Sequence, residues 1–111
     1  MPIGPASIAD ALKTLAELVA GLEDAYWEAS TIETKDLFFD LISAANVETS
    51  ELAKLSIQDH DLEYEPVTLE FKRARARLND LRKILDERVG RASTAARLEV
   101  LISDVVGLVA H

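Results

Sequence analysis

Apolar residues recur every three or four positions along most of the chain, which is the spacing of amphipathic α-helices. The first such run comprises Ile8, Leu12, Leu15, Val19, Leu22 and Tyr26. Ser7 precedes it as a predicted N-cap, and Asp10 stands in the first turn, where the helix dipole favours an acid. Gly21 lies inside the run, which indicates either a close neighbour or simple tolerance of a poor helix former.

A second helix is predicted from about Thr31, because Ser30 and Glu33 have the spacing of a capping box. Its apolar positions are Leu37, Phe38, Leu41, Ile42 and Ala45. Leu52 and Leu55 remain in phase with this stripe, which favours one helix to about residue 57. The alternative is that Asn46 ends the helix and Thr49 or Ser50 begins a short third one.

The polar segment 58–65 is the predicted loop, and Pro66 suits the first position of the helix that follows it. That helix has alternating steps of four and three, at Val67, Phe71, Ala74, Leu78, Leu81 and Leu85. Gly90 is expected just beyond its end. Ser93 or Thr94 is expected to cap a last helix, whose apolar positions include Leu98, Leu101, Ile102, Val105 and Leu108.

Helices joined by short links predict an all-α protein with one domain over residues 1–111, an antiparallel up-down-up-down bundle of about four helices. The last helix is apolar on more than one side, so it is expected to be central or to be covered by a second chain. The sequence therefore predicts a homodimer or a protein partner. The expected interface residues are Leu101, Ile102, Val105, Val106, Val109 and Trp27.

Composition narrows the functional classes. The chain has no Cys, which excludes disulfides and thiolate metal sites. We expect no signal peptide and no membrane span, because the N-terminal residues lack a basic-then-apolar pattern and no run of about 18 apolar residues occurs. A cytoplasmic location is the resulting expectation.

Charge is unevenly distributed along the chain. The net charge is −8, which disfavours general binding to nucleic acid or to anionic membranes. Residues 1–65 hold 14 acidic and 3 basic side chains, whereas residues 66–111 hold 6 acidic and 9 basic ones. The basic side chains of the third helix are therefore expected to face the acidic half, within the chain or across a dimer.

Two acidic clusters are candidates for metal binding. Asp59, His60, Asp61 and Glu63 lie close together in the predicted loop, and hard cations prefer carboxylate ligands. The spacing is not that of an EF-hand, because no Gly supplies the sharp turn. A solvated acidic loop with no metal and no cofactor is the preferred interpretation.

The second cluster is on the helices, where Glu33, Asp36 and Asp40 recur on the second and Glu17, Asp24 and Glu28 lie on the first. The segment 33–36 is similar to one carboxylate motif of the all-α nucleotide pyrophosphohydrolases of the MazG type. No Glu-Glu-x-x-Glu precedes it, so the pattern of that family is incomplete. A polar helix face is the preferred interpretation.

No nucleophile motif or phosphate-binding glycine loop occurs in the chain. The leading hypothesis is a non-enzymatic helical bundle that acts through protein–protein contacts, as a homodimer or a small adaptor. The alternatives are a metal-dependent hydrolase that uses the helix carboxylates and an acidic partner of the antitoxin or immunity type. The sequence identifies neither an activity nor a partner.

Overall fold

The computed structural model describes residues 6–59 and 61–108, with the backbone alone for residues 56–59. It contains α1 (Ile8–Glu28), α2 (Ile32–Asp59), α3 (Leu69–Arg82), α4 (Leu85–Arg88) and α5 (Ala92–Gly107). No strand occurs in this part of the chain, and a single antiparallel bridge joins Ser7 to Glu63. The predicted all-α fold is confirmed.

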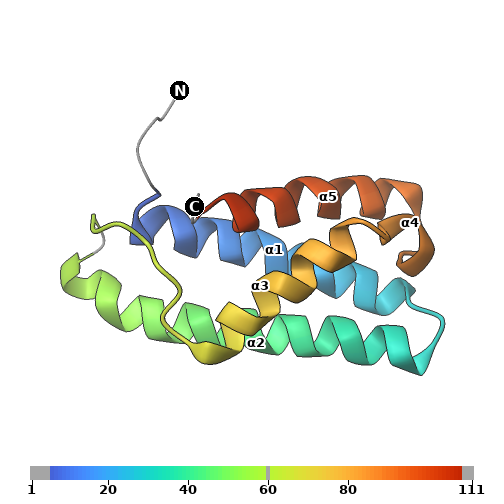
Figure 1. The fold of residues 1–111 in the computed structure, drawn as a ribbon, viewed down its shortest axis with the longest axis horizontal. Coiled ribbons are helices and arrows are strands. Elements are labelled where there is room, and N and C mark those ends of the chain that lie inside the picture. Colours follow the sequence, from blue (N-terminus) through green and yellow to red (C-terminus); the bar gives the residue numbers. More distant parts are fainter. Residues whose placement is uncertain (1–5, 60, 109–111) are drawn as a thin grey trace.

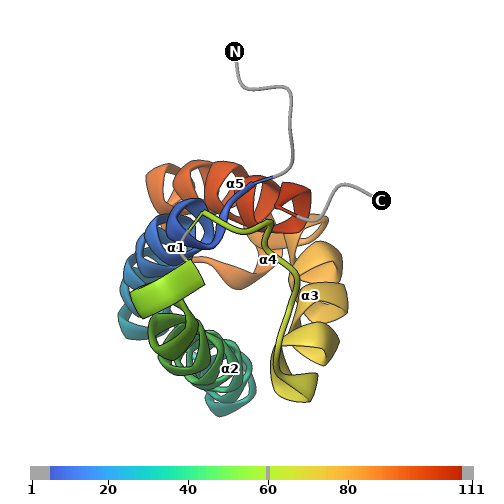
Figure 2. The same cartoon turned by 90° about the vertical axis from the view of Figure 1, so that its left-hand side faces the viewer.

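The four long helices form a ring in the order α1, α2, α3 and α5 (Figures 1 and 2). Neighbours around the ring run in opposite directions, and α3 crosses α2 obliquely (Figure 1). The molecule measures 42 × 28 × 20 Å. The up-down-up-down arrangement expected from the short links is the one observed.

The start of α1 follows from its sequence. Ser7 Oγ accepts a hydrogen bond from the Asp10 backbone N–H, and the Asp10 carboxylate accepts one from the Ser7 N–H. This reciprocal pair satisfies two donors at the helix end. Ser7 was the predicted N-cap.

α2 is one continuous helix, as preferred from the sequence. Its predicted cap was wrong by one residue. Thr31, not Ser30, accepts the hydrogen bond from the Thr34 N–H, at 3.2 Å. Leu55, expected in the apolar stripe, is largely exposed.

α3 begins at Leu69, so the predicted start at Pro66 was wrong. Thr68 is the N-cap, and its Oγ1 accepts the Phe71 N–H at 3.1 Å. Val67 precedes the helix and is exposed rather than part of its apolar stripe. The backbone N–H groups of Val67 and Thr68 instead donate hydrogen bonds to the carboxylate of Glu48 in α2.

The third helix is also interrupted, whereas the sequence predicted one helix that ends just before Gly90. α3 ends at Arg82, and Ile84 has φ −128° and ψ 24°, outside the helical region. The single turn of α4 follows. The break turns Leu85 and Val89 into the core, so the apolar seam continues although the helix does not.

α5 begins at Ala92 after Arg91, without a side-chain cap. Ser93 and Thr94 were expected to cap it, but the Thr94 hydroxyl donates to Glu28 of α1 instead, at 2.7 Å. Gly21 of α1 explains the close packing of these two helices. A Cβ there would lie 2.6 Å from Leu101 Cδ1 and 3.1 Å from Leu98 Cδ2, so the glycine makes room for both side chains.

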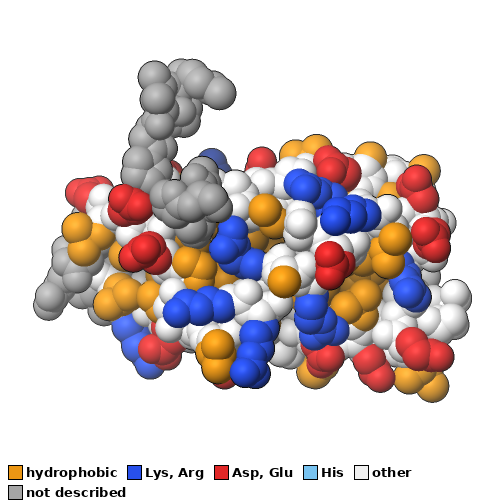
Figure 3. Space-filling view, in the orientation of Figure 1, with side chains coloured by type: hydrophobic (Ala, Val, Ile, Leu, Met, Phe, Trp, Pro, Cys, Tyr) orange, Lys and Arg blue, Asp and Glu red, His pale blue; other side chains and the backbone are white. Residues whose placement is uncertain are grey.

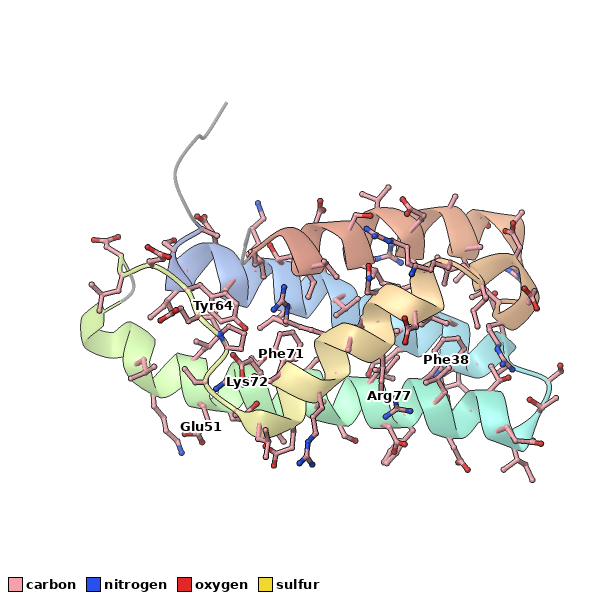
Figure 4. All side chains as sticks on the ribbon, in the orientation of Figure 1. Phe38, Glu51, Tyr64, Phe71, Lys72 and Arg77 are labelled. Atoms are coloured by element: carbon pink, nitrogen blue, oxygen red, sulfur yellow. The ribbon has the colours of Figure 1, made fainter. Side chains whose placement is uncertain are left out.

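The core is mostly leucine and alanine. Three large aromatic side chains, Phe38, Tyr64 and Phe71, are buried at different positions along the long axis of the bundle (Figure 4). Within the ranges 6–59 and 61–108, each helix is too short or too polar to span a bilayer.

Candidate functional site

The outer face of the α1–α2 hairpin carries the large apolar side chains with the highest exposed fractions among the described residues. Trp27 in the last turn of α1 is 77% exposed, while Ile32 and Phe39 of α2 are 74% and 59% exposed. Ile32 and Phe39 are seven residues apart, which places them on the same side of α2. Both helices therefore contribute to one apolar surface, which we call the hairpin face.

A shallow hollow lies in the hairpin face. Its lining comes from Glu23, Tyr26 and Trp27 of α1 and from Phe39 and Ile42 of α2. Its volume is about 260 Å³, below the 300–1,000 Å³ typical of small-molecule pockets. The hollow has the size for one or two side chains.

The aromatic pair beside this hollow is held in place. The rings of Tyr26 and Trp27 meet edge to face, with centroids 5.2 Å apart and planes at 87°. Lys35 Nζ lies 4.6 Å from the centroid of the Tyr26 ring and donates to the Tyr26 carbonyl oxygen at 3.0 Å. These contacts fix the aromatic surface before any partner binds, which lowers the entropic cost of binding.

No other described helix covers this face. α1 has α2 and α5 as neighbours, and α2 has α1 and α3. Figure 2 shows α1 and α2 forming one side of the ring, with α5 above α1 and α3 across the ring from them. The aromatic side chains consequently face solvent.

The predicted interface residues divide between this face and the core. Trp27 is on the hairpin face. Leu101, Ile102 and Val105 are buried inside the single chain, which is the central placement that the sequence left open as the alternative to a second chain. The physical reason is that α5 packs against α1, α3 and α4, and these three helices together cover its wide apolar surface. Val106 is half-buried, and Val109 lies outside the described residues.

Only two of the four candidate metal ligands of the loop have side chains that the structure describes. The Asp59 side chain and all of His60 lie outside the described residues, while Asp61 and Glu63 are exposed. Among the side chains that are described, no group of three or more His, Asp or Glu has the arrangement of a metal site.

The helix carboxylates are spread over separate contacts. Asp24 pairs with Arg97 at 2.8 Å, Asp40 lies 3.9 Å from Arg77, and Glu28 accepts hydrogen bonds from the α5 start. Glu17, Glu33 and Asp36 are exposed. These side chains link helices or face solvent, and they do not converge.

The basic side chains of α3 are likewise dispersed. On the face drawn in Figure 3, Lys and Arg side chains are interspersed with acidic and apolar ones. Arg77 pairs with Asp40 of the acidic half, as expected, whereas Arg82 approaches Glu99 of α5 at 3.9 Å. Arg75 donates to the Val106 carbonyl oxygen at 3.1 Å.

A buried carboxylate was missed in the sequence. Glu48 of α2 is fully buried. Its Oε2 accepts from the Tyr64 hydroxyl at 2.7 Å and the Val67 N–H at 2.9 Å. Its Oε1 accepts from the N–H and the hydroxyl of Thr68, at 3.0 and 2.8 Å. One side chain therefore holds the whole connection from Tyr64 to the start of α3.

Burial and the hydrogen bond to Glu48 raise the pKa of Tyr64 well above its ordinary value of 10. The raised value means that the neutral phenol is the form that the fold stabilises. The sequence did hold a signal for this cluster, because Glu48 is in phase with Leu41, Ala45 and Leu52. An acidic residue in a buried stripe requires hydrogen-bond donors as partners. Those donors lie in the segment 64–68, whose position next to α2 the periodic pattern did not predict.

Comparison with known proteins gave no match, either to a family model, to a curated protein or to a solved structure.

Proposed function

We propose that this protein acts through protein–protein contacts, without catalysis, and that the hairpin face is its docking surface. The observation that carries the proposal is the exposure of Trp27, Ile32 and Phe39 on one face, with a hollow of side-chain size beside them. Large exposed apolar patches mark interaction sites, and Trp and Tyr are the residues most enriched at binding hot spots. A cytoplasmic location and the absence of a cofactor belong to the same proposal.

Other exposed apolar side chains support the choice of this face by contrast. Val47, Leu62, Val67, Leu69 and Val100 are aliphatic side chains with 41–58% exposure. Single exposed aliphatic residues are ordinary on protein surfaces. The hairpin face differs because Trp27 and Ile32, at 77% and 74%, are more exposed than any of these. Phe39, at 59%, is as exposed as Leu62, Leu69 and Val100 within two per cent, but it is aromatic and lies on the same face as the other two.

The proposal is tested by photo-crosslinking in the cells that express the protein. A photoreactive amino acid replaces Trp27 or Phe39 in two variants, and replaces Val100 in a third as the matched control. Val100 is exposed to a similar degree, at 57%, but lies on α5. We expect discrete protein adducts from positions 27 and 39 and none from position 100. No adduct from either hairpin position, or the same adducts from all three, would contradict the proposal.

A further inference from the structure

We propose that the partner of the hairpin face is a second copy of this chain, docked face to face across a two-fold axis. This inference rests on the proposed function, because it names the partner that the same face binds. It moves the expected dimer interface from α5 to the outer side of α1 and α2.

The shape of the face is self-complementary. Trp27 projects into solvent directly beside a hollow that Tyr26, Phe39 and Ile42 line together with it. A two-fold operation brings the projecting ring of each copy against the hollow of the other, since the same patch faces itself in such an interface. A projection and a recess of matching size on one surface are what this symmetry requires.

The ridge of α1 beside Trp27 allows a close approach. Ala9, Ala16 and Ala20 are exposed and lie 18, 11 and 7 residues before Trp27, which places them along the same side of the helix. Their small side chains leave room for a helix of the second copy. This side of α1 therefore has bulky Trp27 at one end and three alanines along its length, with the exposed Lys13 between Ala9 and Ala16.

The charges of the hairpin face also complement each other. Glu23 lines the hollow, and within residues 6–59 and 61–108 no basic group forms an ion pair with it. Lys35 lies over the Tyr26 ring and directs one N–H to the Tyr26 carbonyl. An ammonium has three donors, so two remain for a carboxylate. A two-fold axis pairs Glu23 of each copy with Lys35 of the other.

The whole-molecule charge favours this face over the others for a second copy. Each copy has a net charge of −8, so two copies repel wherever acidic surfaces meet. On the hairpin face, Glu23 lines the hollow and Lys35 lies over the Tyr26 ring beside it. Interfaces that pair opposite charges suppress wrong orientations.

The face is large enough for a stable dimer. Two adjacent helices present a strip about 20 Å wide, and the molecule is 42 Å long. That strip provides the roughly 800 Å² per partner of a standard interface, about an eighth of the 6700 Å² accessible surface.

Sedimentation equilibrium from micromolar to submillimolar concentration tests the inference. We expect the wild type to form a dimer of two 12.2 kDa chains. Trp27→Ala removes the projecting aromatic anchor, so its dimer Kd should rise at least tenfold. Val100→Ala is the control on α5 and should leave Kd unchanged. Circular dichroism checks that each variant retains its helical content.

Charge reversal tests the orientation of the dimer. Glu23→Lys or Lys35→Glu alone places like charges together at both contacts, so each should raise the dimer Kd several-fold. The double variant Glu23→Lys with Lys35→Glu should return Kd to within about twofold of the wild type. A double variant as weak as the single ones would contradict the proposed pairing.

The outcomes separate this inference from the proposed function. A dimer that Trp27→Ala weakens, together with cross-linked adducts of twice the chain mass, supports both. A wild type that stays monomeric at submillimolar concentration, with adducts to a different protein from position 27, overturns the second copy as the partner and retains the docking surface. A dimer that Trp27→Ala leaves unchanged also overturns the inference.

Discussion

At the scale of single residues, Glu48 determines how the chain passes from α2 to α3. Its carboxylate accepts four hydrogen bonds, two at each oxygen, from the segment 64–68. Two of the donors are backbone N–H groups that no helix satisfies, because they come before the first turn of α3. The buried charge is tolerated because every contact is a donor, which is the condition for placing a carboxylate in a core.

Glu48→Gln is expected to destabilise the fold although it preserves the shape of the side chain. An amide presents two N–H donors where the carboxylate accepted hydrogen bonds, so at least one buried donor loses its partner. We expect a loss of about 2–5 kcal/mol in the free energy of unfolding, measured by urea denaturation. Glu51→Gln, three residues later and exposed in a pair with Lys54, is the matched control and should cost less than about 1 kcal/mol. Similar losses in the two variants would show that the four contacts of Glu48 contribute little.

Tyr64 predicts a specific loss of stability in alkali. Its folded pKa lies above the unfolded value of about 10, so above that pH the unfolded chain releases a proton that the folded chain retains. The unfolded state then binds fewer protons, and the free energy of unfolding falls as pH rises, by up to about 1.4 kcal/mol per pH unit. Below the unfolded pKa this contribution of Tyr64 is fully present.

The measurement is the free energy of unfolding of the wild type and Tyr64→Phe on both sides of pH 10. The variant lacks the phenol, so the gap in stability between it and the wild type should narrow as pH rises above that value. A gap that stays constant would mean that the phenol of Tyr64 ionises with equal ease in the folded and unfolded chains.

At the scale of helices, local signals predicted the elements whose ends are determined by neighbouring residues. The Ser7 cap of α1 and the continuity of α2 depend on residues within one or two turns, and both were correct. The start of α3 was wrong because it depends on Glu48, which is 20 residues away from Thr68. The break at Ile84 was missed because it serves the burial of Leu85 and Val89, a tertiary requirement without a local signature.

The apolar stripe of α3 was predictable in its buried positions. Leu78 and Leu81 are 1% and 2% exposed, so Leu→Ala at either should lower the free energy of unfolding by about 2–5 kcal/mol. Arg73→Ala on the exposed side of the same helix should cost less than about 0.5 kcal/mol. Chemical denaturation of the three variants measures this difference, and an equal small loss in all of them would mean that the buried side of α3 is misassigned.

At the scale of the whole molecule, the sequence predicted the bundle, but three of the interface residues that it placed on the last helix are buried within the single chain. The apolar width of α5 indicated an interface, whereas the ring of helices uses that width for contacts with α1, α3 and α4. Phe39 and Ile32 lie off the main apolar stripe of α2, and only their spacing of seven residues signalled a second apolar side. Among the interface candidates whose side chains the structure describes, Trp27 is the most exposed, because it lies in the last turn of α1 on the outward side.

The uneven charge distribution along the chain is also explained only by the arrangement of the whole molecule. The acidic half of the chain forms the hairpin, and some of its carboxylates reach α5 and α3, as Asp24 does to Arg97 and Asp40 to Arg77. Exposed pairs of this kind add little to stability.

The most direct test of a second copy docked on the hairpin face is the fluorescence of Trp27, the only tryptophan in the chain. In dilute protein, acrylamide should quench it freely, because the side chain is 77% exposed. As the concentration rises from nanomolar to submillimolar, the emission should shift to the blue and quenching should weaken along one binding curve. The Glu23→Lys variant should show the same change only at higher concentration. Emission and quenching that stay those of a water-exposed indole at every concentration would contradict docking of a second copy on this face.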